Sequence, residues 1–223
     1  MTTPRIPELA QGDCLKRDEF ERRYAAMPAL KKAELIEGVV YLGSPVNHVR
    51  HGRPHADLGA WLGFYRALSP GLVVSDNATL RLDLDNEPQP DLLLALPPHA
   101  GSGLRSTADG YLEGPPELVI EVAASSVSYD LHQKKNVYRR NGVREYLVHR
   151  VEDEAVDWFV AERGVFVAQQ PDDDGLLRGA AFPGLWLDVG ALLAGDLGAL
   201  RAAVERGCAT AEHAAFRRRL AAP

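Results

Sequence analysis

The sequence predicts an α/β (α+β) fold in which a mixed central β-sheet is flanked by helices. Residues 117–125 (ELVIEVAAS) are apolar on both faces, which is typical of a central, covered strand. Residues 129–141 follow with helical spacing, and Gly142 just beyond them suits a helix end. Further strand-like segments come next, so that helices and strands mix along the chain.

The N-terminal part predicts two helices with β-structure between them. Apolar residues at helical spacing indicate a first helix over residues 17–27 and a second from Pro54 to Leu68. A proline is tolerated in the first turn of a helix. Residues 33–43 are apolar and β-branched around Gly38, which predicts a hairpin or a bent strand.

The middle of the chain predicts two strands and then a loop. Residues 72–82 and 90–96 have strand patterns. Residues 97–116 are rich in Gly and Pro, which favours a long surface loop. After the central strand and helix, three more strands are expected, the last two forming a hairpin around Gly164; they span residues 144–150, 155–161 and 164–170.

The C-terminal part predicts irregular structure followed by helices. A turn at residues 171–175 precedes a loop at 182–189, and two short helices then follow. The Ala- and Arg-rich stretch 207–223 is expected to form a loosely docked helix.

Length and composition predict one main domain. The chain has 223 residues, of which 46% are hydrophobic and 25% charged, close to the average for globular proteins. We expect an N-terminal extension at residues 1–15, a domain at 16–193 and a C-terminal helical extension at 194–223. Cys14 and Cys208 lie far apart in the sequence, which favours a reducing compartment over a disulfide scaffold. With no signal segment and no run of 18 apolar residues, a cytoplasmic protein without membrane contact is expected.

The net charge of −6 argues against a protein that coats nucleic acid by bulk charge. A local site that handles phosphates with the help of a metal remains open. The sequence contains no Gly-rich phosphate loop, no GxSxG elbow and no HExxH helix, so NTPase, serine hydrolase and zincin functions lack support.

Two carboxylates are candidates for such a site. Glu121 shares one face of the central strand with Val119 and Ala123, and a carboxylate there is costly unless a partner compensates it. A structural ion pair or a solvated strand end is the alternative. Asp91 follows Pro90 at the start of a predicted strand, and taken alone it is an ordinary turn aspartate.

The helix after the central strand adds a candidate cation. At 100° per residue, Lys134 falls on the apolar face, with Asp130 one turn earlier and Lys135 at the edge. The alternative is that Lys134 extends its ammonium to water along an apolar surface. Two carboxylates suit Mg²⁺, which binds through one or two carboxylates together with waters and substrate phosphates. A nearby lysine can stabilise negative charge in a transition state.

Several segments resemble the Uma-type restriction endonucleases of the PD-(D/E)xK nuclease superfamily. They are AELIEG at residues 33–38, Pro-Asp at 90–91, and the 116–148 block with PPELVIEV and SYDLHQKKNVYRRNGVREYLV. The resemblance runs from about residue 16 to 193. It implies a restriction-endonuclease-like core and Mg²⁺-dependent hydrolysis of DNA, with Mn²⁺ able to substitute.

The resemblance also implies roles for single residues. Asp91 and Glu121 match the metal-binding acidic residues, and Glu34 matches an early glutamate that reaches the same site. The lysine expected two positions after Glu121 is replaced by Ala123, and Lys134 on the following helix matches the lysine that stands in for it. The expected catalytic set is Asp91, Glu121, Lys134 and Glu34.

Contacts with the substrate are expected from His51, Lys135 and Asp130. His51 matches a histidine before the second helix, although His48 and His55 lie close to it in the sequence. Basic residues are expected to form a rim around the site; they are Arg50, Arg53, Lys134, Lys135, Arg139, Arg140 and Arg144.

The leading hypothesis is therefore a metal-dependent endonuclease acting on DNA. A homodimer is expected, because cutting two strands with one site per chain favours a two-fold assembly. One alternative is a non-catalytic nucleic-acid-binding or regulatory module that retains the fold. Another is a metal-dependent hydrolase of a different substrate.

Overall fold

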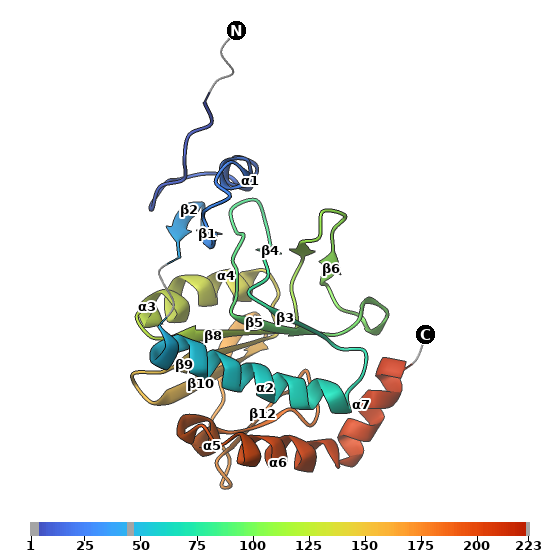
Figure 1. Cartoon of the computed structure of the whole chain (residues 1–223). Helices are drawn as coiled ribbons and strands as arrows, with labels where there is room; N and C mark the ends of the chain where they lie inside the picture. The colour runs from blue at the N-terminus through green and yellow to red at the C-terminus, as the bar shows by residue number, and fades with distance from the viewer. Residues whose placement is uncertain (1–4, 44–46, 222–223) are drawn as a thin grey trace.

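A six-stranded sheet lies at the centre of the computed structural model, which describes residues 5–43 and 47–221 (Figure 1). The strand order is β11-β10-β9-β8-β5-β3. The strands are β3 (Val73–Asp76), β5 (Leu92–Ala95), β8 (Leu118–Ala123), β9 (Glu145–Arg150), β10 (Ala155–Glu162) and β11 (Val165–Ala168). Neighbours β8 and β9 run parallel, whereas the other pairs are antiparallel. The mixed sheet predicted from the sequence is confirmed.

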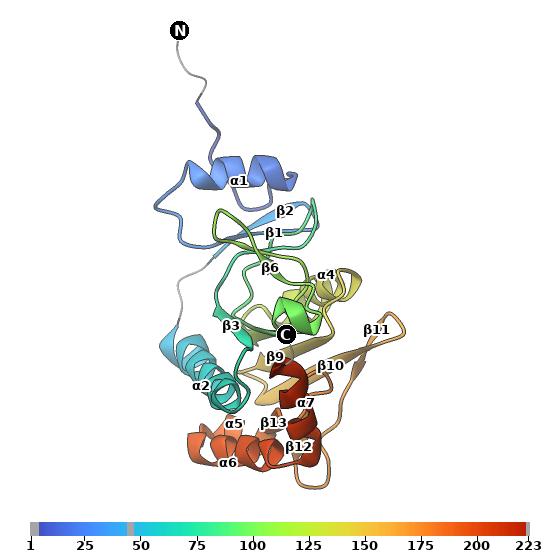
Figure 2. The ribbon, with the colours of Figure 1, turned by 90° about the vertical axis from the view of Figure 1, so that its right-hand side faces the viewer.

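Helices cover both faces of this sheet (Figure 2). On one face lie α2 (Arg53–Leu68), α5 (Val189–Ala194), α6 (Leu197–Cys208) and α7 (Ala211–Ala221). A continuous helical segment covers the other face; it consists of α3 (Val127–Tyr129), η3 (Asp130–Lys134) and α4 (Lys135–Arg140). Side chains of β8 alternate between the two faces: Ile120 packs in the core beneath α2, whereas Val119 packs beneath α4.

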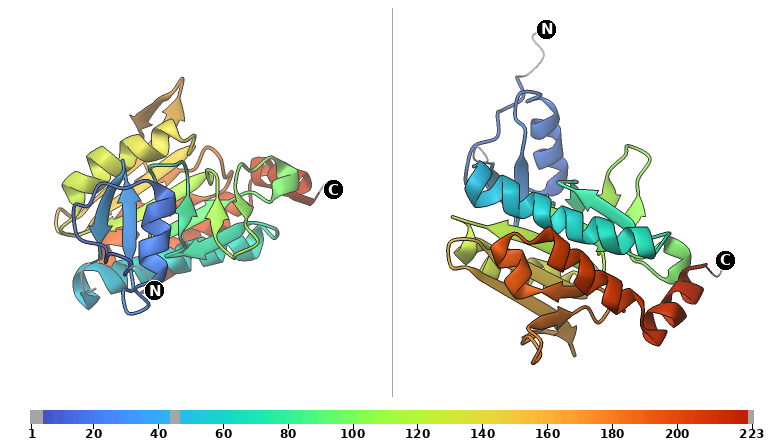
Figure 3. Two further views of the ribbon diagram at one scale, coloured as in Figure 1. Left: turned by 90° about the horizontal axis from the view of Figure 1, so that it is seen from above. Right: turned by 60° about the horizontal axis from the view of Figure 1, so that its bottom comes forward.

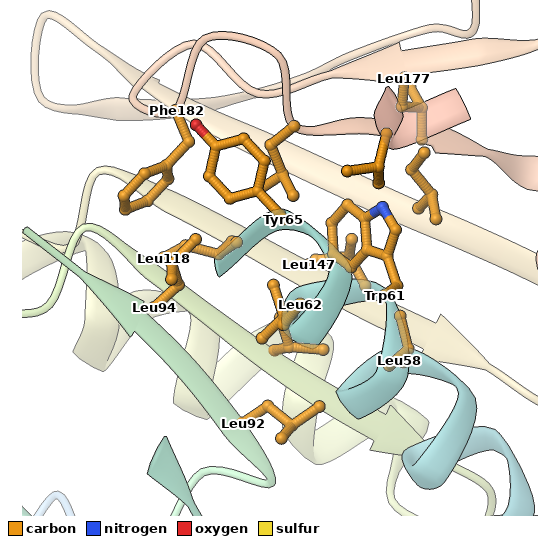
Figure 4. Close-up of a cluster of buried hydrophobic side chains, with 14 of the residues drawn as sticks. Leu58, Trp61, Leu62, Tyr65, Leu92, Leu94, Leu118, Leu147, Leu177 and Phe182 are labelled. Carbon is orange, nitrogen blue, oxygen red and sulfur yellow. The ribbon is translucent and has the colours of Figure 1, made fainter. Parts of the chain in front are cut away.

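Large amphipathic rings on α2 join the main core to the C-terminal part of the chain (Figure 4). The Trp61 indole donates a hydrogen bond to the Trp186 carbonyl (2.9 Å), and the Tyr65 hydroxyl donates to the Pro183 carbonyl (2.8 Å). Each ring buries its apolar body in the core while its polar atom finds a partner. Helices α2 and α6 run side by side beneath the sheet (Figure 3).

The described C-terminal residues are helical as predicted, but the expectation of a loosely docked final helix is wrong. Phe216 and Leu220 of α7 are 3% and 5% exposed and belong to the main core. His213 Nε2 lies 2.8 Å from the Ser69 hydroxyl, which ties α7 to the end of α2. The sequence pattern missed this packing because α7 carries only a few apolar residues among its arginines.

The N-terminal segments form a smaller layer above the sheet (Figure 1). Helix α1 (Arg17–Ala25) packs through Phe20 on a hairpin of β1 (Ala33–Ile36) and β2 (Val39–Leu42). The hairpin predicted around Gly38 is confirmed. Its two turn residues, Glu37 and Gly38, both have positive φ angles (54° and 75°), as a two-residue hairpin of this twist requires.

Two predictions for the middle of the chain need correction. The strand expected at 72–82 is split in two, because the chain turns at Asn77 (φ 49°) and enters a different sheet as β4 (Leu80–Arg81). Strand β4 pairs with β7 (Leu112–Glu113), which pairs with β6 (Arg105–Ser106). The stretch predicted as a loop therefore contains two strands and the short helix η2 (Pro98–Ala100).

A second small sheet was also missed. Strand β12 (Leu176–Arg178), just after the expected turn, pairs with β13 (Trp186–Asp188), which lies inside the expected loop. Two- and three-residue strands are too short to show a period of two. None of the described helices is long and apolar enough to cross a membrane.

Candidate functional site

A cleft of about 670 Å³ opens where the C-terminal end of β8 meets the N-terminal end of β5. Strand β1, the π-helix η1 (His48–Gly52), helix α2 and the π-helix η3 complete its walls. Of the seven residues predicted for catalysis, metal binding or substrate contact, six line this cleft; they are Glu34, His51, Asp91, Glu121, Asp130 and Lys134. The fold thus brings together side chains that are up to 100 positions apart in the sequence.

Two hydrogen bonds and one nearby ammonium hold the Asp91 side chain in the cleft. Its Oδ2 atom accepts hydrogen bonds from the Val122 backbone N–H (2.8 Å) and from His51 Nε2 (3.1 Å). Lys32 Nζ lies 3.6 Å from Oδ1. Burial by itself would raise the pKa of Asp91, but the His51 hydrogen bond and the Lys32 charge outweigh it and hold the pKa well below its usual range. Asp91 is therefore an anion at neutral pH.

Lys134 lies at the centre of a buried cluster of carboxylates. Its side chain is 4% exposed, and Nζ lies 2.9 Å from Glu34 Oε1, 3.0 Å from Glu121 Oε1 and 3.8 Å from Asp130 Oδ1. Burial favours the neutral amine, but Glu121 and Glu34 outweigh it and raise the pKa of Lys134 well above its usual value. The ammonium is thus charged and is held by carboxylates. It lies on the buried face of the helical segment, as the helical spacing predicted.

Glu121 accepts two hydrogen bonds on one oxygen. Oε1 accepts from Lys134 Nζ (3.0 Å) and from the Tyr138 hydroxyl (2.8 Å). No hydrogen bond from the described residues reaches Oε2. Burial raises the pKa of Glu121 to about 8 against the opposing charge of Lys134, and the charges of Asp91, Asp130 and Glu34 raise it further. One ammonium thus faces an excess of carboxylates.

Two π-helical turns border the cleft. Residues 129–141 were predicted as a regular helix, but residues 130–134 form a π-helix, η3, between two α-helical parts. The extra residue in this wider turn changes which side chains face inward, and π-turns of this kind are frequent at functional sites. The second, η1, carries His51 and begins at Asn47, whose side chain accepts from the backbone N–H groups of Val49 and Arg50.

The structure does not bring Lys135 into the cleft, in contrast to the expected substrate contact. Its ammonium lies 3.6 Å from the centre of the Phe159 ring, where burial lowers the pKa of Lys135. The predicted basic rim is also smaller than expected: Arg139 donates to the Gly164 carbonyl and Arg140 to Glu37. Only Arg50 and Lys134 of that set line the cleft.

The histidines near the cleft occupy different places. His51 bonds Asp91, and its Nδ1 atom is buried without a partner among the described residues. His55 Nε2 lies 3.1 Å from the Asp91 carbonyl and 3.3 Å from Asp76. His48 is exposed and does not line the cleft.

Three residues that shape the site were not predicted from the sequence. Lys32 lies two positions before Glu34, so a period of two through β1 could have placed both on one face. Tyr138 was assigned only to the apolar stripe, yet its hydroxyl bonds Glu121. Tyr129 lines the cleft with a buried hydroxyl that lacks a partner among the described residues, and no local pattern signals this.

The cleft suits a hard divalent cation bound by few protein ligands. Among residues 5–43 and 47–221, no group of three or more His, Cys, Asp or Glu side chains is arranged to hold a metal ion. Mg²⁺ does not need such a group, because one or two carboxylates suffice when waters and phosphates supply the other ligands. Asp91 is ionised, Glu121 Oε2 receives no hydrogen bond from the described residues, and the local excess of negative charge favours a cation. The donor set therefore fits Mg²⁺ or Mn²⁺.

Comparison with known proteins supports the fold and identifies the family. A crystal structure described as "a putative nuclease belonging to DUF820 from Anabaena variabilis" is similar, with a TM-score of 0.57 and 13% identity. The alignment covers 78% of this chain and 96% of that chain. No curated protein matches the sequence. The model of the Uma2 family, described as "Putative restriction endonuclease", matches residues 17–190, well over half of the chain. This protein therefore belongs to the Uma2 family.

Proposed function

We propose that this protein is a Mg²⁺-dependent endonuclease that hydrolyses phosphodiester bonds in DNA. The observation that carries the proposal is the position of Lys134, whose Nζ atom lies 3.0 Å from Glu121 and 2.9 Å from Glu34 in the cleft that also contains Asp91. Two carboxylates and an ammonium in one cleft are the groups that phosphodiester hydrolysis needs. The family to which the chain belongs and the nuclease of similar fold support the same reaction class.

Each residue has a part in this proposal. Asp91 and Glu121 are the metal ligands, with Glu34 assisting, because they supply the hard oxygen donors of the cleft. Bound Mg²⁺ would lower the pKa of a water molecule and stabilise negative charge on the phosphate oxygens. Lys134 supplies a fixed positive charge beside the reacting phosphate, since its three carboxylate partners prevent it from turning away. His51 orients Asp91 and, with Asp130, lines the space for substrate.

DNA is the proposed substrate and a homodimer the proposed active form. The positive side chains that line the cleft, Lys32, Arg50 and Lys134, can neutralise a few phosphates although the chain carries a net charge of −6. A two-fold dimer would place two such clefts on opposite strands.

Cleavage of supercoiled plasmid tests the proposal. With Mg²⁺ or Mn²⁺, the protein is expected to convert supercoiled DNA to nicked or linear forms, and EDTA should abolish the conversion. Glu121→Gln, purified in the same way, should lose activity, whereas Asp173→Asn, a change at an exposed carboxylate, should retain it.

The same assay separates the alternatives. Metal-independent retention of DNA on a gel, without cleavage in either metal, would favour the non-catalytic binding module. Equal cleavage by wild type and Glu121→Gln would indicate a contaminating nuclease and overturn the assignment of the site.

A further inference from the structure

A second cavity, which we call the α1 pocket, lies between α1 and the small sheet of β4, β6 and β7. Its volume is about 600 Å³, and none of its lining residues belongs to the cleft. Figure 1 shows α1, β4 and β6 on the same side of the central sheet. The residues that decide its chemistry are Glu21, Tyr24, Met27, Arg81, Glu87 and Tyr111.

Glu87 places a buried acceptor in the wall of this pocket. Its backbone pairs with Leu35 of β1, through bonds of 2.8 and 3.1 Å, which fixes its position. Glu87 is only 3% exposed, and its Oε2 atom is buried without a hydrogen-bond partner among the described residues. The nearest cation, Arg81 Nε, is 3.9 Å away. A buried acceptor without a donor is unfavourable, and a ligand that donates to it would relieve that cost.

The positive charges of the pocket are already matched. Arg81 donates to Glu21 Oε1 (2.7 Å), lies 2.9 Å from Asp109 Oδ2, and stacks 4.5 Å from the Tyr111 ring centre. Arg22 donates to Glu19 through Nε (2.7 Å) and Nη2 (2.8 Å). An anionic ligand would have to displace these carboxylates from their arginines.

The pocket also contains carboxyl groups that lack a hydrogen-bonded cation in the described part of the chain. Asp18 and Glu87 line the pocket without a hydrogen-bonded cation among the described residues. Burial and the neighbouring Glu21 raise the pKa of Glu87 to about 8, as expected where carboxylates crowd together. At neutral pH Glu87 is therefore largely protonated, and a cation that approached it would favour the ionised carboxylate.

One side of the pocket is apolar, which disfavours a bare metal ion as its ligand. Ala25, Met27, Pro28 and Leu30 line one side, beside the ring of Tyr24. Within the described ranges no set of three His, Cys, Asp or Glu side chains is placed to bind a metal. The pocket instead suits a cationic group attached to an apolar body.

We propose that the α1 pocket binds a small organic cation, an amine, amidine or guanidine, whose N–H groups donate to Glu87. Its apolar part lies against Tyr24, Met27 and Leu30. The same head group occurs in free amines and on lysine and arginine side chains of peptides, and the test distinguishes these two sources.

Calorimetric titration of the full chain with benzamidine tests the charge requirement. Benzamidine is expected to bind with one site per chain, and benzamide, its neutral isostere, at least tenfold more weakly. Agmatine and the peptide Gly-Arg-Gly are then compared: tighter binding of agmatine indicates a free small molecule, and tighter binding of the peptide indicates a protein side chain. Failure of both benzamidine and agmatine to bind, or equal binding of benzamide, overturns the proposal.

Variants locate the binding. Glu87→Gln keeps the shape of the side chain and should weaken benzamidine binding at least tenfold. Ala25→Trp fills the pocket from an exposed position on α1 and should do the same, which guards against misfolding as the explanation. Asp173→Asn should bind as wild type does. If both pocket variants bind normally, the site lies elsewhere and the proposal fails. The measurement needs neither DNA nor Mg²⁺, so its failure leaves the proposed nuclease function untouched.

Discussion

Lys134 Nζ lies 3.0 Å from Glu121 Oε1, and both side chains are 4% exposed or less. The two residues come from different elements, the end of η3 and the middle of β8, and each makes the burial of the other tolerable. Taking either charge out of water alone would cost several kcal/mol. The pair therefore couples the stability of the fold to the chemistry of the cleft.

Lys134→Met is expected to lose about 100-fold or more in DNA cleavage rate, because a preorganised positive charge beside the reacting phosphate is removed. Lys135→Met is expected to change the rate only a few-fold, because its ammonium lies against Phe159 outside the cleft. Both variants are compared in one Mg²⁺-dependent plasmid assay.

The Lys134 variant also needs a stability measurement. Loss of the lysine leaves Glu34, Glu121 and Asp130 without their cation, so urea unfolding should show a loss of about 3–5 kcal/mol. Assays must run where the variant is still folded. Equal rates for the two variants, or a greater loss at Lys135, would contradict the assignment of Lys134.

Asp91→Asn and Glu121→Gln are each expected to weaken Mg²⁺ binding at least tenfold. Each removes a hard, charged oxygen donor while the shape of the side chain is kept. Calorimetric titration of the unliganded proteins measures this, with Asp173→Asn as the exposed control. Unchanged Mg²⁺ affinity in both cleft variants would show that the metal, if bound, lies elsewhere.

The sequence predicted those parts of the site whose signals are local. The apolar strand around Glu121 and the helical face with Lys134 each show a period within a few residues, and the structure places both side chains inward. The approach of Lys32 to Asp91 joins residues 59 positions apart in the sequence, and no local pattern predicts it.

Short strands and the π-helical turn could not be predicted from the periodicity of apolar residues. Strands β4, β6 and β7 have two residues each, so neither propensity nor alternation separates them from loop. The π-turn at 130–134 leaves the hydrophobic spacing almost helical, although it changes the direction of the side chains that follow. Lys135 contacts Phe159 of β10, a strand that is distant in the sequence. A helical wheel shows only residues of the helix itself, so it cannot predict this contact.

The affinity for DNA is expected to fall with salt concentration, with a slope that corresponds to only a few neutralised phosphates. With Ca²⁺ in place of Mg²⁺, log affinity should fall against log salt by about 0.9 per phosphate neutralised. Arg50→Gln, at the cleft, should reduce this slope by about 1. Arg139→Gln should leave it unchanged, because Arg139 does not line the cleft. Equal slopes for the two variants would show that the DNA follows another surface.

Gly207→Ala is expected to destabilise the protein by about 2 kcal/mol or more. A Cβ atom there would lie 2.3 Å from the Gly184 carbonyl oxygen, which would push α6 away from the turn before β13. Gly63→Ala in α2 is the control, since its Cβ would meet nothing within 4 Å and should stabilise the helix by up to about 1 kcal/mol. Urea unfolding of both variants decides whether the C-terminal helices belong to the cooperative unit. An unaffected Gly207→Ala protein would argue that they do not.

His149 on β9 is expected to make the protein sensitive to mild acid. The side chain is 5% exposed, its Nδ1 atom has no partner among the described residues, and burial lowers the pKa of His149 from 6.5 to about 4. Because the folded state binds this proton more weakly than the unfolded state, the stability linked to His149 is complete above pH 6.5 and is lost as the pH falls toward 4. The loss at pH 4.5 should be on the order of 2 kcal/mol.

His149→Leu removes the titrating group, so its free energy of unfolding should fall less than that of wild type between pH 7.5 and 4.5. His132→Leu, at an exposed position, should follow wild type, and comparison of the three by urea unfolding removes any constant packing difference. If wild type and His149→Leu lose the same stability over this interval, the acid sensitivity does not come from His149.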